Sequence, residues 1–283
     1  MKLSDFKRVS GRFNSEYKLF DDHLRIGENI SLSHSWGTSV SNNAALGGTL
    51  YEAYKFQSIT PVKNLEDEYA GNVFSDIPNP MGKLHRNKDN KDKKSRLVGN
   101  LYAELHLFDG FMFKTSFGAD YNNLYRRSFS PKYDEINASE KLSGLSNRNA
   151  WNFNWVFTNT LNYTKTFGDH TINALLGLES LRNRYEYFTA SRDGFPSDDP
   201  NFHFLDAGDV GTQKNSGSAT EYSMVSYFGK IDYNYHDRYL VAFTLRRDGS
   251  SVWGIISGVT SRPLRWDGVS VMSHSLMWRL SIT

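Results

Sequence analysis

The sequence contains no cysteine, which rules out disulfides, thiolate metal sites and cysteine nucleophiles. It has only 7 Pro in 283 residues. No apolar run of about 18 residues is present, so a membrane-spanning helix is excluded. The net charge is only +2 and the basic residues are scattered, which argues against nucleic-acid binding.

Aromatic residues are abundant, with 16 Tyr and 19 Phe, and they favour strands because their rings pack well on a pleated surface. The clearest strand signal is the alternation within residues 152–167. Its odd positions include Phe153, Trp155, Phe157 and Leu161, whereas its even positions are Asn, Thr and one Val. Such a strand is much longer than the average of about 5–6 residues in soluble proteins.

The same alternation recurs in other segments, so an all-β protein is predicted. These segments are 24–33, 97–107, 111–121 and 225–235. Short turns are predicted at 21–23, 109–110, 168–169 and 236–237, and long polar loops at 36–95, 126–149, 188–220 and 249–268. Tight turns at one end and long loops at the other are typical of outer-membrane barrels.

Aromatic residues are predicted to form two girdles, one at each end of the strands. Those beside the short turns are Tyr17, Phe20, Phe108, Phe111, Phe167, Tyr235 and Tyr239, and those at the opposite ends are Tyr121, Tyr125, Tyr185 and Tyr187. A soluble β-sandwich also alternates and stays open as an alternative, although most of its connections would run to about 4–6 residues.

Three stretches resemble the SusC/RagA branch of the TonB-dependent transporters. They are RLVGNLYAE at 96–104 with FKTSFGADY at 113–121, YFGKIDYNY at 227–235 with DRYL at 237–240, and LRRDGSS at 245–251. The sequences ITPV at 59–62 and NPM at 79–81 also fit, and the resemblance covers residues 5–252. Residues 254–272 do not match, whereas 273–281 resemble the next strand.

The resemblance implies an antiparallel up-and-down transmembrane β-barrel of about 22 strands with a plug in its lumen. About nine strands and no plug are recognised here, so residues 1–283 are expected to form part of the barrel domain, with 254–283 as an atypical tail. The start, 1–7, lacks an apolar export signal. The chain is therefore expected to lack the true N-terminus, as in a truncated or frame-disturbed gene.

The function implied is that of a segment of a nutrient transporter in the Gram-negative outer membrane. Its cargo would be a glycan or a peptide, its partners a SusD-like surface lipoprotein and the TonB complex, the latter reached through the missing N-terminal region. The alternative is a soluble β-rich adhesin or carbohydrate-binding module. The short turns are predicted to lie on the periplasmic side.

No catalytic, cofactor or metal site is predicted, and the ligand-binding residues are not identified. Glu104 and His106 share the polar face and are interpreted as a hydrated wall rather than an acid–base pair. The charged run 88–94 is interpreted as a solvated loop. A calcium site would need defined spacing of oxygen ligands, which Asp193, Asp198, Asp199, Asp206 and Asp209 lack.

Exposed aromatic residues are the best candidates for ligand capture in the loops. They are Trp36, Tyr51, Tyr54 and Phe56 in the first loop and Phe195, Phe202 and Phe204 in the third. Packing of the loops on one another or on a lid protein explains these residues equally well.

Overall fold

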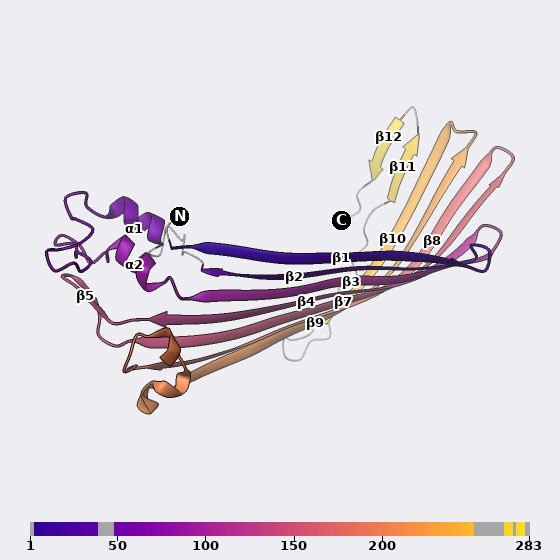
Figure 1. Cartoon of the computed structure of the whole chain (residues 1–283). Coiled ribbons are helices and arrows are strands. Elements are labelled where there is room, and N and C mark those ends of the chain that lie inside the picture. The colour runs from indigo at the N-terminus through magenta and orange to yellow at the C-terminus, as the bar shows by residue number, and fades with distance from the viewer. Residues whose placement is uncertain (1–2, 39–47, 252–268, 274–275, 281–283) are drawn as a thin grey trace, which may run out of the picture.

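The computed structural model describes residues 3–38, 48–251, 269–273 and 276–280. Ten strands form one curved antiparallel sheet, in which each strand pairs with the strands of that sheet that precede and follow it along the chain (Figure 1). The strands are β1 (Asp5–Leu19), β2 (Leu24–Thr38), β3 (Lys91–Phe108), β4 (Phe111–Ser130), β7 (Gly144–Phe167), β8 (His170–Asp193), β9 (Lys214–Tyr235), β10 (Tyr239–Ser250), β11 (Val269–Ser273) and β12 (Leu276–Leu280). The predicted meander is confirmed.

The predicted short turns after β1, β3, β7 and β9 all lie at one end of the sheet (Figure 1). Residues with positive φ close them: Gly110 at 82°, Gly168 at 56° and Asp237 at 52°. Two-residue hairpins favour positive φ because it matches the right-handed twist of the strands. We refer to this as the turn end and to the opposite one as the loop end.

The strands reach farther toward the loop end than the alternation predicts. The segment 36–95 was predicted to be a loop, but β2 runs to Thr38 and β3 begins at Lys91. The loops at 126–149 and 188–220 are likewise shorter than predicted, because β4, β7, β8 and β9 extend into them. The alternation of apolar and polar residues ends before the strands do, because most residues on both faces are polar near the loop end. The backbone pairing nevertheless continues to the ends of the strands.

The loop end carries small elements of its own. Helices α1 (Thr49–Lys55) and α2 (Pro80–Arg86) lie between β2 and β3, and the hairpin of β5 (Tyr133–Glu135) and β6 (Ala138–Glu140) lies between β4 and β7. Three single-turn helices, η1 (Pro200–Phe202), η2 (Leu205–Ala207) and η3 (Val210–Thr212), lie between β8 and β9. No helix among the described residues is long and apolar enough to cross a membrane.

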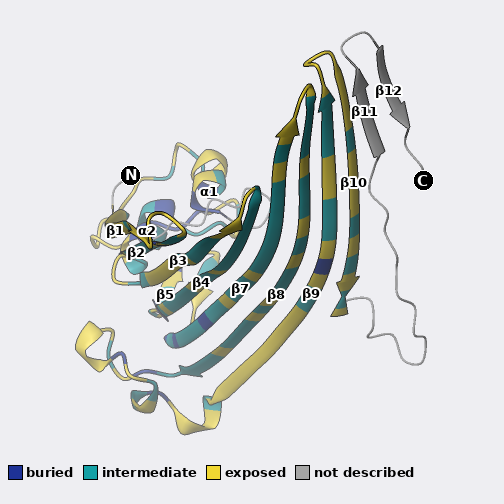
Figure 2. Cartoon of the chain, turned by 90° about the vertical axis from the view of Figure 1, so that its right-hand side faces the viewer, coloured by how far each residue is buried: buried dark blue, intermediate teal, exposed yellow. Residues whose placement is uncertain are grey.

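The two faces of the sheet differ as predicted. One apolar row crosses successive strands through Leu24, Leu105, Phe113, Leu161 and Leu176. We call this the outer face and the opposite, mostly polar face the inner face. Large apolar side chains of the outer face, such as Leu101, Leu176 and Tyr227, remain exposed. Figure 2 shows that the middle strands alternate between exposed and partly buried residues, with few buried ones. No second layer covers this face in the described part of the chain, so the sandwich alternative is not supported.

The girdle at the turn end is confirmed. Phe108, Phe111 and Tyr163 are in contact, with ring centroids 4.6 and 4.4 Å apart. The prediction for the loop end is wrong in part. Tyr185 and Tyr187 occupy alternate positions of β8 together with Asn183, and side chains at these positions point to the inner face. The aromatic residues of the outer face near the loop end include Tyr121, Trp151 and Phe153.

Candidate functional site

The inner face near the turn end is a surface of closely paired charges. Lys114 donates to Glu104 at 2.8 Å, and Arg25 lies 3.8 Å from the same carboxylate. The hydroxyl of Tyr102 donates to Glu16 at 2.7 Å from two strands away. The Tyr102 ring crosses the strand between them at Gly27, where a Cβ would stand 2.3 Å from the ring. Gly27 therefore lets the aromatic ring lie flat on the sheet.

A second cluster repeats this arrangement on β8 to β10. The ring of Phe228 covers Gly177, where a Cβ would lie 2.1 Å from it. The Arg246 guanidinium lies 5.7 Å from the Phe228 centroid and binds Asp248 at 2.9 Å and Glu179 at 3.5 Å. Both clusters hold long side chains against the sheet, so the turn half of the inner face is lined with paired charges.

Glu104 and His106 do not form an acid–base pair. The carboxylate of Glu104 is held by Lys114 and Arg25, while the backbone N–H of His106 donates to the carbonyl oxygen of His23. No contact joins the two side chains in the described structure.

At the loop end, a buried polar centre joins the first two loops. Asn79, 2% exposed, caps α2 by accepting from the N–H groups of Met81 and Gly82, and its amide donates to the carbonyl oxygens of Val62 and Ala70 at 3.0 Å. Its own N–H donates to Glu135 of the second loop at 2.6 Å.

Glu135 itself is 3% exposed and accepts from Arg86 of α2 at 2.7 Å. Arg86 also stacks on Tyr133, with its guanidinium carbon 3.8 Å from the ring centroid. Burial beside these groups raises the pKa of Tyr133. A buried carboxylate with a cation and an amide donor fixes the first loop against the β5–β6 hairpin.

We expect Glu135→Gln to weaken this junction by about 1–3 kcal/mol, because a buried charge-assisted hydrogen bond becomes a neutral one. Hydrogen exchange of residues 62–82 and 131–143 in a complete barrel should then accelerate. Glu140→Gln is the matched control, since Glu140 is exposed in the same hairpin. Equal acceleration in both variants would contradict the role of Glu135.

The third loop packs on the sheet through a small hydrophobic core of Phe129, Leu145 and Phe195. The ring of His203, 5% exposed, stacks on Phe129 at 3.6 Å between centroids, and its Nε2 lies 3.2 Å from the carbonyl oxygen of Asp198. Asn90 of the first loop binds the N–H and the carbonyl oxygen of Phe129 at 2.7 and 3.0 Å. All three loops therefore meet around Phe129.

Burial lowers the pKa of His203 below its ordinary value of 6.5. The neutral ring is thus favoured in the folded loop, and the stability it contributes is present above pH 6.5 and is lost as the pH falls through the lowered pKa. We expect exchange in 195–212, corrected for intrinsic pH dependence, to accelerate between pH 7 and pH 5. His203→Gln should abolish this acceleration, and its persistence would assign the effect to another group.

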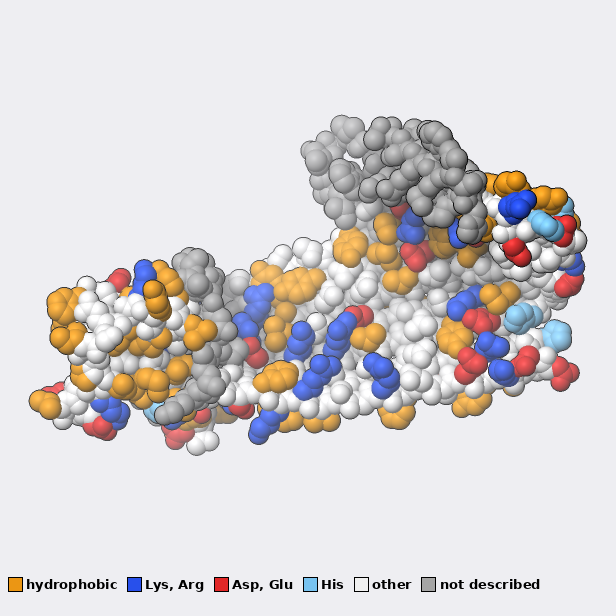
Figure 3. Space-filling view, turned by 90° about the horizontal axis from the view of Figure 1, so that it is seen from above, with side chains coloured by type: hydrophobic (Ala, Val, Ile, Leu, Met, Phe, Trp, Pro, Cys, Tyr) orange, Lys and Arg blue, Asp and Glu red, His pale blue; other side chains and the backbone are white. Residues whose placement is uncertain are grey.

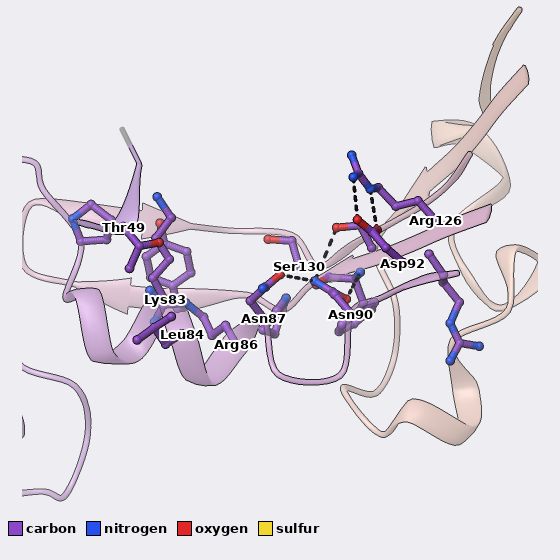
Figure 4. A pocket seen from close by; sticks show the side chains of 15 residues that line it. Thr49, Lys83, Leu84, Arg86, Asn87, Asn90, Asp92, Arg126 and Ser130 are labelled. Atoms are coloured by element: carbon purple, nitrogen blue, oxygen red, sulfur yellow. Dashed lines mark hydrogen bonds and ion pairs between the residues drawn. The ribbon is translucent and has the colours of Figure 1, made fainter. Parts of the chain in front are cut away.

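A pocket of about 560 Å³ opens between α2 and the loop ends of β3 and β4 (Figure 4). Arg126 donates to both oxygens of Asp92 at 2.6 and 2.7 Å on one side. Lys83 and Arg86 of α2 line the other side, where Lys83 is held by the buried Glu52 at 2.7 Å. The pocket could hold an anionic or hydrogen-bonding group.

The aromatic residues proposed for ligand capture do not gather in one place. Phe195 is buried in the loop core, and Trp36 lies in β2 beside His34, with ring centroids 5.4 Å apart. Tyr54, Phe202 and Phe204 remain exposed at 89%, 53% and 64%. Loop packing thus explains Phe195, while the exposed rings stay candidates.

The charged groups singled out in the loops take structural roles. Asp199 and Asp209 cap η1 and η3, and Asp206 faces Arg192 at 3.5 Å. No group of three or more potential ligand side chains is placed to hold a metal within the described residues. The prediction of a solvated loop at 88–94 is wrong for Lys91 to Lys94, which belong to β3 because they pair with β4.

The signal for the loop junction was present in the sequence only in part. Asn79 followed by Pro80 is a recognisable start of a helix. Nothing in the sequence marks Glu135 as the buried partner of Arg86, because the two lie 49 positions apart. The NPM sequence at 79–81 predicts a family resemblance but not the burial of Asn79.

Comparison with known proteins supports the assignment from the residues. No family model matches the sequence. The chain is 31% identical over 235 residues to TonB-dependent receptor P3 of Formosa agariphila, covering 81% of this chain and 23% of that receptor. It is 24% identical over 301 residues to TonB-dependent receptor SusC of Bacteroides thetaiotaomicron, covering 99% of this chain and 28% of SusC.

The fold is similar to that of the RagAB peptide transporter, with a TM-score of 0.72 and 21% identity over 92% of this chain and 29% of that one. The chain thus spans about a quarter of the length of its curated relatives, and those relatives are receptors. Most of the segment 254–272, which was predicted not to match the family, lies outside the described residues, while β11 and β12 extend the sheet. The motifs, the meander and the relatives together show that the chain belongs to the SusC/RagA-type TonB-dependent receptors and corresponds to part of their β-barrel.

Proposed function

We propose that the chain forms a section of the wall of an outer-membrane transporter that imports oligosaccharides or peptides in a TonB-dependent manner. The observation that carries the proposal is the two-sided meander, with an exposed apolar outer face and a polar inner face. A bilayer selects an apolar outer surface, and a water-filled lumen selects a polar inner one. Contact with TonB would involve a region of the receptor outside this segment.

The course of the apolar surface supports insertion with tilted strands. On β4 and β7 the outer face is still aromatic at Tyr121 and Phe153, whereas the same row carries Arg184 on β8 and Glu221 on β9. The apolar band therefore crosses the strands obliquely. Strands of outer-membrane barrels tilt by about 35–45°, so a band level with the membrane crosses them in this way.

In this proposal the turn end faces the periplasm and the loop end faces the cell exterior. Exposed apolar side chains on the first two loops would contact a SusD-like surface lipoprotein, since patches of this kind mark interaction sites. They include Ile59, Leu65, Phe74 and Ile136, which are 80%, 107%, 67% and 67% exposed. No catalytic role is proposed.

Orientation can be tested by single-cysteine labelling, because the sequence has no cysteine of its own. Lys141→Cys lies in the second loop and Asp109→Cys in a turn, where the native side chains are 73% and 83% exposed. In a complete barrel in intact cells, an impermeant maleimide should label position 141. Position 109 should react only after permeabilisation, and labelling of position 109 in intact cells would refute the orientation.

Substrate recognition is tested in liposomes that contain a complete barrel carrying this segment and its lipoprotein partner. Binding of a labelled oligosaccharide or peptide should depend on the barrel. Purification of this segment as a soluble sugar-binding protein would instead favour the adhesin or carbohydrate-binding alternative.

A further inference from the structure

The inner face is unevenly charged along the strands. In four successive residue rows of the loop half, from the row of Arg126 to the row of Arg12, six cations face two carboxylates, Asp92 and Asp120. We call these six cations the basic band: Arg8, Arg12, Lys94, Arg96, Arg126 and Arg148. Figure 3 looks onto the hollow face and shows Lys and Arg side chains gathered on the half next to the loops, with few Asp and Glu among them.

Toward the turn end the same face is balanced. Its cations have carboxylate neighbours, as in the pairs of Lys114 with Glu104, Arg246 with Glu179 and Lys230 with Asp232. The excess of positive charge is therefore confined to the loop half and is not a general property of the inner face.

Four of the six cations of the basic band form no ion pair within the described residues, and one of them, Arg148, is held instead by a hydrogen bond to Tyr185. Arg96 and Arg126 are paired with Asp120 and Asp92. Arg8, Arg12 and Lys94 are exposed and form no ion pair within the described part of the chain. Clustered cations without carboxylate partners give this part of the inner face a positive potential, which attracts anionic ligands.

The surroundings of the band indicate the kind of ligand. Serine residues pair with the cations in neighbouring strands, as Ser33 does with Arg96 and Ser35 with Lys94. Because serine side chains are short, the longer charged side chains project beyond them from the inner face. Farther along the same rows lie amide and phenol groups. Asn183 donates to Asn152 at 2.9 Å, and Tyr185 accepts from Arg148 at 3.1 Å.

We propose that the basic band binds the anionic groups of an acidic oligosaccharide on its way into the lumen. Cations recognise carboxylate or sulfate groups, while the amides and the phenol both donate and accept hydrogen bonds, as sugar hydroxyls require. Arg126 also lines the pocket beside α2, so the band continues toward the loops. This inference rests on the proposed transport function and specifies its substrate class.

The test uses a complete barrel that carries this segment and measures affinity for fluorescent sulfated maltoheptaose, an oligogalacturonate, neutral maltoheptaose and an oligoglutamate peptide. The variant Arg8→Gln/Lys94→Gln removes two unpaired cations from the band. Removing each should weaken binding of an anionic sugar about fivefold at low salt, the factor that a contact between unit charges in water provides. The double variant should therefore lose about 25-fold, and less as added salt screens the charges.

Lys7→Gln/Lys93→Gln is the matched control, because it makes the same charge change at adjacent positions of the same strands but on the outer face. We expect it to leave affinity within about twofold. Comparable losses in both variants, or equal affinity for neutral and sulfated maltoheptaose, would overturn the inference.

The outcomes also separate this inference from the proposed function. Binding of neutral sugar without preference for charge would leave the transport function standing and reject the band as a determinant. Failure of every probe to bind would count against the transport function itself. Tighter binding of oligoglutamate than of either anionic sugar would reject the sugar in favour of an acidic peptide. The relative affinities for sulfated maltoheptaose and oligogalacturonate show whether sulfate or carboxylate is preferred.

Discussion

Expressed alone and refolded without detergent, this chain is expected to aggregate rather than yield a monomer. Within the described structure, β1 and β12 each have a neighbouring strand on one side only. β1 is 15 residues long and carries Val9 and Phe13, both 65% exposed. A long, apolar strand edge is a template for pairing with other chains, and the outer face adds a continuous apolar surface.

Size-exclusion chromatography with light scattering measures this outcome directly. Val9→Lys/Phe13→Lys should slow aggregation without abolishing it, because charge blocks the edge of β1 but leaves the rest of the outer face apolar. Arg8→Lys/Arg12→Lys is the matched control on the inner face of the same strand and should change little. A monodisperse, detergent-free monomer of the unmodified chain would contradict the barrel assignment.

In lipid the open edges are expected to prevent transport by the isolated chain as well. Each unpaired backbone N–H or carbonyl group facing hydrocarbon costs several kcal/mol, so spanning sheets must close. Refolded into liposomes alone, the chain should cause no permeability to labelled oligosaccharides. A selective, reproducible pore formed by this segment would show that it closes on itself.

The central parts of the strands could be predicted from the sequence because one face of each strand meets lipid and the other meets water. An apolar outside and a polar inside force a period of two, as in Phe153, Trp155 and Phe157 against Asn152 and Asn154. The pattern also fixes the register, since a slip of one residue would exchange the two faces. Nine strands were predicted, and the sheet has ten.

The loop end could not be predicted in the same way. There both faces of the extended strands are polar, so the periodic signal disappears although the backbone pairing persists through Arg126 and Arg148. The contacts that organise the loops join residues far apart in the sequence, as Glu135 does with Asn79 and Arg86. Their burial depends on how three loops pack together, which no local pattern specifies.

The basic band was missed for a related reason. Its members are separate charges on β1, β3, β4 and β7, and only the register of those strands brings them into adjacent rows. The composition of the whole sequence hides them, because its 33 Lys and Arg are nearly balanced by 31 Asp and Glu. A face-by-face reading of charge along predicted strands would have found them.

In a complete barrel that contains this segment, Leu176→Arg is expected to lower the free energy of unfolding by about 2–4 kcal/mol, the cost of placing an arginine on the lipid face near the midplane. Leu176 is 65% exposed on the outer face, beside Leu161 of β7 and Gly229 of β9. It lies near the middle of the apolar band, with the girdle of the turn end to one side. Reversible folding into lipid vesicles, followed by denaturant titration, measures the change.

Asn173→Arg is the matched control, three residues away on the same strand but on the inner face. There the new guanidinium would meet water and the carboxylate of Asp232, its neighbour in β9, so the substitution should cost less than about 0.5 kcal/mol. The change in charge is the same in both variants, so a cost of several kcal/mol at Leu176 alone assigns the outer face to hydrocarbon. Equal costs would mean that the outer face does not contact lipid, and a larger cost at Asn173 would mean that the two faces are reversed.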